Sequence, residues 1–402
     1  MSEEHTKRSF RIPDYFPHFA CKIGTCRNAC CQGWPISITL QNYFDLLGLD
    51  CSPDLRRRLD GGMHLADNPS PEHYAQFSPR YDGNCPLRME DGRCALHADV
   101  GEAYQPDICR LYPRGIRLED GVLECSCAAS CEGVIELLLH RAGKEPITFL
   151  EKELPLSLPP HLEERNIQFA TMGKAWEIRL YLIHILQNRA MPLPERMLFL
   201  GRQMERMDKV MHSGDPAALE ALLAEESTPH TQTADEIQAE DLRTGLWIAG
   251  KLTALLDARH NSIQAYGEEA LAYFGAEEGA MERYEAARTH LETAFPDWEI
   301  FFENLLVNHM YFAQFPFQDR PESLPQEYAA LCAVYMLLRF MTIGCMADSM
   351  DKDATAQEED LVDVCAALFR LIEHTSFDRY AALMLKSVGC ATAADLVNVM
   401  RL

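Results

Sequence analysis

Residues 19–38 read FACKIGTCRNACCQGWPISI, and this stretch decides how the first third of the chain folds. Its four cysteines have the spacing C-x4-C-x3-C-C. Further cysteines follow in short blocks, which are NCPLRMEDGRCALH at residues 84–97, CRLYPR at 109–114 and a serine–cysteine pair at 126–127. The sequence between them is rich in turn-forming pairs and has only short apolar runs. Such a segment has little core of its own, so we expect bound metal to supply the missing cross-links.

Composition narrows the classes of protein that this chain can be. The chain has 402 residues and 15 cysteines, and its start, MSEEHTKRSFRIPDYF, lacks the apolar run of a secretory signal, which favours a cytoplasmic protein. A reducing compartment disfavours structural disulfides, so dense cysteine there is typical of metal or redox chemistry. The 37 basic and 61 acidic side chains give a net charge of -24, which argues against binding to nucleic acid or to anionic membranes.

The pattern changes to long helices beyond residue 160, after a proline-rich connection. Apolar residues recur there at helical spacing, which predicts helices. The predicted helices span residues 176–186, 194–211, 242–256, 281–295, 327–346 and 359–374. The longest apolar stretch, residues 328–347, contains Arg339 and is predicted to be a buried helix rather than a membrane span.

The fold class follows from these two halves. We predict a mainly α protein in which an irregular, cysteine-rich metal-binding domain at residues 1–145 packs on an all-helical domain at residues 160–402. A polar stretch predicts a mobile loop near residues 225–240. No glycine-rich GxGxxG turn follows a strand, so a Rossmann methyltransferase domain is not indicated.

The cysteine pattern predicts a thiolate site, because thiolates are soft ligands suited to zinc and to iron–sulfur clusters, each of which takes four. Cys30 and Cys31 are adjacent and would differ in direction by about 100° in a helix. Either they lie in an irregular turn around one centre, or only some of the cysteines are ligands. The paired CxxC knuckles of zinc ribbons and the CxxxCxxC run of radical S-adenosylmethionine enzymes are both absent.

Taken together, the cysteine blocks resemble the flagellin lysine N-methylase family. The N-terminal part of that family in turn resembles a wider group of zinc- or iron-chelating domains with a CxxCxxCC-like start. The resemblance continues in PLPERMLFLG (192–201), FENLLVNHMYFAQFPF (302–317) and LIEHTSFDRY (371–380), so it covers nearly the whole chain. It implies an S-adenosylmethionine-dependent protein-lysine methyltransferase that is assisted by a [4Fe-4S] cluster and acts on flagellin in the cytoplasm.

The resemblance also implies a set of metal ligands. The cysteines that correspond to those of the family are Cys21, Cys26, Cys30, Cys31, Cys85, Cys94, Cys109 and Cys127. One [4Fe-4S] cluster needs only four of them, so this set is too large unless a second centre exists. Cys51, Cys125 and Cys131 have no counterpart, and Cys131 is not expected to be a ligand. Zinc is the alternative metal.

Two arginines follow a predicted ligand and are the candidates for cofactor binding. Arg110 and Arg114 would hold a carboxylate in a bidentate fork or donate to cluster sulfurs. The alternative is that they only pair with nearby acids such as Asp107 or Glu119. The catalytic residues are not identified by the sequence.

Other side chains invite a functional interpretation but are predicted to have structural roles. Trp34 is expected to form a hydrophobic lid over the centre. His97 is an alternative ligand that is not needed when cysteines are ample. Asn308 and His309 are predicted to be a buried, satisfied polar pair in an apolar helix.

Two other classes of protein remain as alternatives. One is a non-catalytic iron- or zinc-binding module that engages a protein partner, and the other is an interaction protein with a purely structural zinc site. The colour of the anaerobically purified protein separates an iron–sulfur protein, which is brown, from a zinc protein, which is colourless. Methylation of flagellin that depends on added S-adenosylmethionine separates the enzyme from the module.

Overall fold

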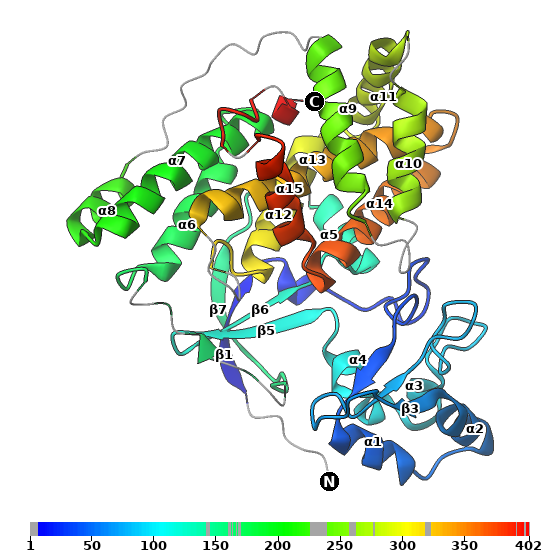
Figure 1. Cartoon of the computed structure of the whole chain (residues 1–402). Helices are drawn as coiled ribbons and strands as arrows, with labels where there is room; N and C mark the ends of the chain where they lie inside the picture. Colours follow the sequence, from blue (N-terminus) through cyan, green and yellow to red (C-terminus); the bar gives the residue numbers. More distant parts are fainter. Residues whose placement is uncertain are drawn as a thin grey trace. The chain divides into compact units, whose positions relative to one another are not determined.

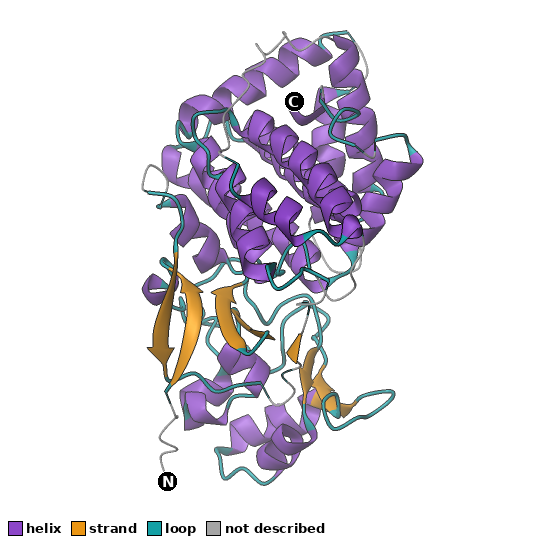
Figure 2. Cartoon of the chain, turned by 90° about the vertical axis from the view of Figure 1, so that its left-hand side faces the viewer, coloured by secondary structure: helices purple, strands orange, loops and turns teal. Residues whose placement is uncertain are grey.

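The structure, a computed structural model, describes most of the chain. The described residues are 7–141, 145–159, 162, 164–165, 167, 170–225, 239–256, 263–275, 278–317, 323–390, 392–397 and 399–401. Within them the chain is mainly helical, as predicted, and its strands all lie between residues 8 and 165 (Figure 2). The predicted mobile loop near residues 225–240 falls almost wholly outside the described residues.

The chain divides into two compact units (Figure 1). Unit 1 comprises residues 1–134 and 148–165, and unit 2 comprises residues 135–147 and 166–402. Residues 135–147 thus belong to unit 2, and residues 148–165 belong to unit 1. Helix α5 (Glu132–Leu139) continues from unit 1 into unit 2, and strand β7 (Phe149–Leu154) then returns to pair with β1 (Arg8–Pro13) along its full length.

Unit 1 is built on two small sheets. The five-stranded sheet has the order β7-β1-β6-β5-β8, and the three-stranded antiparallel sheet has the order β2-β4-β3. The remaining strands are β2 (Ile36–Ile38), β3 (Met63–Leu65), β4 (Ala75–Phe77), β5 (Arg114–Glu119), β6 (Val122–Cys127) and β8 (Glu164–Arg165). Most are too short to show an alternating pattern, which is why the sequence predicted an irregular segment.

Short helices complete unit 1. They are α1 (Leu40–Leu47), α2 (Pro53–Gly62), α3 (Ala95–Val100) and α4 (Asp107–Leu111), with 3-10 turns at Phe16–His18 and Glu102–Tyr104. The Asn42 amide donates to the Thr39 hydroxyl at the start of α1, and the Leu55 amide donates to Ser52 at the start of α2. The buried faces of α1 and α2 meet Phe77 and Cys85 in a small core. Unit 1 thus has a modest core of its own.

Unit 2 is helical. Beyond α5 its helices are α6 (Ala175–Leu186), α7 (Leu193–Ser213), α8 (Pro216–Leu223), α9 (Ala239–Thr253), α10 (Ile263–Phe274), α11 (Ala280–Ala294), α12 (Trp298–Phe312), α13 (Leu324–Asp348), α14 (Ala354–His374) and α15 (Phe377–Ser387). A 3-10 turn, η3, spans Val399–Arg401.

Helix α13 forms the centre of unit 2. It contacts α7, α9, α10, α11, α14 and α15 (Figure 1). By length and composition it would suffice to cross a bilayer, yet 94% of its most apolar window is buried by the rest of the chain. It is a core helix, as predicted, and it shows no polar face because other helices surround it.

Two glycines let helices approach α13 closely. A Cβ at Gly201 of α7 would lie 2.3 Å from a ring carbon of Tyr328, and a Cβ at Gly344 of α13 would lie 2.3 Å from the Ala270 side chain of α10. Side chains larger than hydrogen do not fit at either crossing, so the glycines set the distances between these helices.

We expect Gly201→Ala to lower the free energy of unfolding by about 1–3 kcal/mol, because the buried Tyr328 ring cannot move away from the added methyl group. Gly250→Ala in α9 is the matched control. The nearest atom to its new methyl group lies 3.9 Å away, so a gain of up to about 1 kcal/mol in helix propensity is expected. Denaturant or thermal unfolding measures both, and equal shifts in the two variants would contradict the close approach.

His309 on α12 is buried, as predicted, but it is not fully satisfied. Among the described residues its Nδ1 has no hydrogen-bond partner, and its Nε2 lies 4.0 Å from Asp378 Oδ2. Burial lowers the pKa of His309 from 6.5 to about 4. The imidazole is therefore neutral in the folded chain at neutral pH.

This burial predicts acid sensitivity. Between pH 6.5 and pH 4 the unfolded chain binds a proton at His309 that the folded chain does not, so stability falls as the pH is lowered through this window. The loss reaches about 3 kcal/mol near pH 4. Unfolding measured from pH 7 to pH 4 should be less dependent on pH in His309→Gln than in the wild type, and an unchanged slope would refute the assignment.

Candidate metal centre

Unit 1 contains a cavity of about 240 Å³ that is lined by eight cysteines. They are Cys21, Cys26, Cys30, Cys31, Cys85, Cys94, Cys109 and Cys131. Seven of the eight predicted ligands are in this group. The eighth, Cys127, is fully buried in β6 and does not line the cavity, whereas Cys131, which was not expected to be a ligand, does.

Backbone hydrogen bonds bring three of these cysteines together. The Cys85 amide donates to the Cys31 carbonyl (2.9 Å), beside a β-bridge between Gln32 and Asn84. A second bridge joins Arg88 and Cys94, the residue that precedes α3. Segments more than 50 residues apart thus place Cys31, Cys85 and Cys94 around one side of the cavity, with Cys109 on α4 nearby.

The loop that carries Cys21 and Cys26 is held at two points. A Cβ at Gly24 would lie 2.6 Å from the Gly92 carbonyl carbon and oxygen, and Gly24 has a φ of +88°, so only glycine suits this contact. At the other end Glu132, the residue after Cys131, accepts from Lys22 Nζ (2.5 Å) and from the Asn28 amide (2.9 Å). The loop is thereby fixed beside the start of α5.

Burial and neighbouring sulfurs raise the pKa values of two thiols at this side of the cavity. Burial raises the pKa of Cys85 to about 12, and the nearby Cys31 and Cys94 sulfurs add to the increase. Burial also raises the pKa of Cys109, with further contributions from Cys94, Cys85 and Cys31. Cys85 and Cys109 would therefore stay protonated without a cation, and a bound metal would remove that penalty.

A second group of neighbours lies around α5. Burial raises the pKa of Cys131 to about 12, opposed by the amides of Val134 and Gly133 and reinforced by Cys26 and Cys21. Burial raises the pKa of Cys26 as well, with Glu132 and Cys21 adding to it.

Cys30 and Cys31 are adjacent, but their thiol pKa values are shifted in opposite directions. A hydrogen bond with Cys31 raises the pKa of Cys30. The same bond and Arg88, whose Nη1 lies 3.9 Å from the Cys31 Sγ, lower the pKa of Cys31 to about 6. Cys31 is the thiol that ionises first.

The cysteines surround the cavity rather than converge on one point. In the described part of the chain no three His, Cys, Asp or Glu side chains form a group that could hold a single metal ion as they stand. A tetrahedral zinc ion draws its four sulfurs to about 2.3 Å from itself. A single zinc ion would therefore require these side chains to move inward.

The two candidate arginines both line the cavity. Arg110 forms an ion pair with Asp107, as the local alternative predicted, yet its Nε is buried and has no hydrogen-bond partner among the described residues. The Arg114 guanidinium lies 5.3 Å from the centre of the Phe19 ring.

His97 lies at the cavity wall, whereas Trp34 does not line the cavity. The Trp34 indole donates to the Cys30 carbonyl (3.0 Å).

Sequence reasoning did not predict Cys131 as a ligand, because the resemblance supplied no counterpart for it. One sequence signal bears on it, since Val134, Leu137 and Leu138 follow helical spacing directly after Cys131. Cysteines at such positions can face a neighbouring loop, but the loop partner is supplied only by the fold. Glu132 was missed for the same reason.

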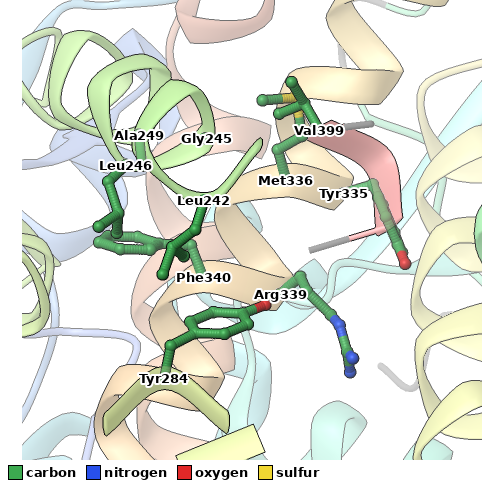
Figure 3. A pocket seen from close by; sticks show the side chains of 10 residues that line it. All are labelled: Leu242, Gly245, Leu246, Ala249, Tyr284, Tyr335, Met336, Arg339, Phe340 and Val399. Carbon is green, nitrogen blue, oxygen red and sulfur yellow. The ribbon is translucent and has the colours of Figure 1, made fainter. Parts of the chain in front are cut away.

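Two cavities in unit 2 are less suited to a cofactor. Figure 3 shows one of about 30 Å³, with apolar side chains of α9 and α13 around it and with Tyr284, Tyr335 and Arg339 at its edge. That volume holds one or two water molecules. The other, about 190 Å³, is lined by acidic residues that include Glu269, Asp348 and Asp360.

Comparison with known proteins places the chain in a family. The structure defines a protein with a thiol-lined cavity in one unit and a helical second unit. Residues 179–396 match the FliB lysine N-methylase C-terminal domain, which covers more than half of the chain. The chain belongs to the FliB lysine N-methylase family. The zinc- or iron-chelating group with the CxxCxxCC-like start stays a resemblance only.

Individual relatives are more distant. The chain is 27% identical over 135 residues to proteins called lysine-N-methylase in Salmonella choleraesuis (strain SC-B67) and in Salmonella typhimurium (strain LT2), and the match covers 32% of this chain and 32% of each relative. It is 27% identical over 135 residues to the flagellar biosynthetic protein FliU of Salmonella muenchen, covering 75% of that protein. No solved structure matches the chain.

We expect Glu132→Ala to release the loop that carries Cys21 and Cys26, because the buried carboxylate holds Lys22 and the Asn28 amide. Amide hydrogen exchange in residues 21–31 should become at least tenfold faster, which corresponds to a loss of about 1.4 kcal/mol in local stability.

Glu124→Ala is the matched control. Glu124 is also buried and pairs with Arg11 (3.2 Å), but it lies in β6. Its loss should destabilise unit 1 without a selective effect on residues 21–31, and equal exchange in both variants would show that Glu132 has no special part in holding the loop.

Proposed function

We propose that this protein is a protein-lysine N-methyltransferase that moves a methyl group from S-adenosylmethionine to lysine side chains of flagellin in the cytoplasm. The observation that carries the proposal is the family match over residues 179–396. The names of the relatives, lysine-N-methylase and flagellar biosynthetic protein, support the reaction and the flagellar substrate.

The cysteine-lined cavity is the proposed cofactor site. We propose that a [4Fe-4S] cluster binds there, with zinc as the alternative metal, and the donor set of buried thiols supports this choice. When bound, such a cluster supplies iron that can anchor the amino and carboxylate groups of S-adenosylmethionine. The chain itself supplies the walls that exclude water and the cations beside the thiols.

Arg110 is the residue best placed to bind the methyl donor. Its Nε is buried at the cavity wall without a hydrogen-bond partner among the described residues, while Asp107 holds the other side of the guanidinium. A guanidinium fixed in this way is oriented for a carboxylate such as that of S-adenosylmethionine. Asp107 thus orients the guanidinium of Arg110 but leaves its Nε available to a ligand.

The reaction also requires a neutral lysine amine. Free lysine has a pKa of about 10.4, so the site must desolvate the amine or remove its proton before it attacks the methyl carbon. The alignment of amine, methyl group and sulfur contributes much of the rate gain. No residue of the described chain is assigned as the base.

The test is methylation of purified, unmethylated flagellin. The anaerobically purified full-length protein, with S-adenosylmethionine, should increase the mass of flagellin in steps of one methyl group. Absence of any mass change in a protein that retains its metal would favour the alternative, a non-catalytic metal-binding module that engages a protein partner.

A variant of Arg110 tests the donor site. Arg110→Gln should raise the KM for S-adenosylmethionine about 10- to 100-fold, the range expected when a charge-assisted hydrogen bond is lost. The control is Arg57→Gln on α2, which removes an exposed arginine that pairs with Asp54 (3.1 Å). An unchanged KM for Arg110→Gln would exclude Arg110 from the donor site.

A further inference from the structure

Helix α1 of unit 1 has an apolar face that is wider than the core it covers. Leu46 is its fully buried residue, with 2% of its surface exposed. The other apolar side chains follow Leu46 around the helix, over an arc of about 160° (~100° per residue), in the order Tyr43, Leu47, Leu40 and Phe44. Phe44 and Leu47 remain 54% and 49% exposed, so the apolar face extends beyond the core.

Aromatic contacts hold the exposed Phe44 ring in place. Its centre lies 5.5 Å from the centre of the Tyr43 ring and 6.1 Å from that of the Tyr74 ring, and the two tyrosine rings are 5.2 Å apart. Both tyrosines are partly buried against the small core of unit 1. A ring supported in this way has little freedom to lose on binding, which is typical of anchor residues in protein interfaces. We call Tyr43, Phe44, Leu47 and Tyr74 the α1 patch.

The segments that carry the α1 patch are acidic. Residues 40–50 and 66–77 together contain four acidic side chains and no lysine or arginine. Asp45, in α1 itself, is exposed. Arg56 reaches the carbonyl end of this helix, but it also pairs with Asp60 (3.5 Å). An apolar surface with such surroundings is complementary to an apolar segment flanked by basic residues.

The same charges disfavour other occupants of the patch. An anionic membrane would be repelled by the acidic side chains around it. A second copy of this chain, joined through the same patch on both protomers, would bring two equal sets of acidic side chains together. A basic protein segment is therefore the occupant that the charges favour.

The α1 patch lies close to the thiol-lined cavity. The Asp107 amide, at the start of α4, donates to Asn42 Oδ1 of α1 (3.3 Å; Figure 1). Helix α4 carries Cys109 and Arg110, which line the cavity. Asn42 and Phe44 are on opposite sides of α1, so a protein on the patch lies about one helix diameter, about 10–12 Å, from α4.

We propose that the α1 patch is the docking surface for the protein substrate and binds an apolar segment of it that is flanked by lysine or arginine. This rests on the proposed function and deepens it, because contacts remote from the reacting group contribute to the binding of a substrate. The patch selects the substrate and holds one of its lysines near the cavity. It takes no part in the transfer of the methyl group.

The experiment measures the Kd of purified, unmethylated flagellin for the anaerobically purified full-length protein, without S-adenosylmethionine. Phe44→Gln with Leu47→Gln removes the exposed part of the patch and should raise the Kd at least tenfold, as expected for interface anchors. Tyr380→Gln with Leu383→Gln on α15 is the matched control, because these side chains are 61% and 45% exposed in unit 2. The control should bind like the wild type, and circular dichroism establishes that both variants are folded.

A second pair of substitutions tests the charges. Asp45→Asn with Asp67→Asn removes two exposed carboxylates beside the patch and should raise the Kd about two- to fivefold at low ionic strength. The difference from the wild type should shrink as salt is added, because salt screens exposed charges. Binding by the wild type that does not change with salt would contradict a basic partner segment.

Three results would overturn the docking surface. They are an unchanged Kd in the patch variant, an equal loss of affinity in the α15 control, and a wild-type dimer that the patch variant dissociates, since a second copy would then be the occupant. If the patch variant does not fold, hydrogen exchange in the wild type decides. Flagellin should slow amide exchange in residues 40–50, and unchanged exchange there would refute the proposal.

The docking surface and the proposed activity can fail separately. A wild type that binds flagellin through the patch but transfers no methyl group refutes the activity alone. In an active enzyme, the patch variant should raise the KM for flagellin and leave the KM for S-adenosylmethionine unchanged. An active enzyme whose KM for flagellin is the same with and without the patch refutes the docking surface alone.

Discussion

The constraint on which unit 1 depends is the burial of many thiols beside one another. Burial and the proximity of other sulfurs raise the pKa values of Cys85 and Cys131 to about 12, so these side chains do not ionise without a cation. A bound metal reverses this, because it stabilises the thiolate more than burial penalises it. The cavity therefore gathers buried thiols whose ionisation would require a bound cation.

A few backbone and side-chain contacts between distant segments hold this cavity together. Isolated β-bridges join the segments that carry Cys31, Cys85 and Cys94, a glycine contact brings two turns together, and Glu132 fixes the loop at the other side. Each contact is weak alone, but together they join segments from residue 21 to residue 133. Unit 1 can be small because metal binding would add to a core that is modest in size.

Unit 2, unlike unit 1, is held together by a large apolar core. Its stability comes from apolar packing around α13, with glycines at Gly201 and Gly344 where helices come close. The part of the chain that matches the FliB lysine N-methylase C-terminal domain lies in this unit, whereas the thiols of the cavity lie in the other. The family match and the thiol-lined cavity thus lie in different parts of the chain.

The sequence by itself determined the helices of unit 2 and the identity of most cavity cysteines. Helices α6, α7, α13 and α14 lie within a few residues of their predicted ranges, because a periodic apolar stripe or a long apolar run is a local signal. Helix α8 has only eight residues and shows too few turns of the pattern to be predicted, and α10 and α15 were not predicted either.

Only the tertiary structure decided which thiols are neighbours. Cys127 and Cys131 are four residues apart, and both come after the CRLYPR segment in the sequence. The pairing of β5 with β6 buries Cys127, whereas Cys131, at the start of α5, lines the cavity. Likewise the contacts of Glu132 with Lys22 and Asn28 join positions more than 100 residues apart. Spacing along the chain carries no information about such contacts, because they depend on how distant segments pack.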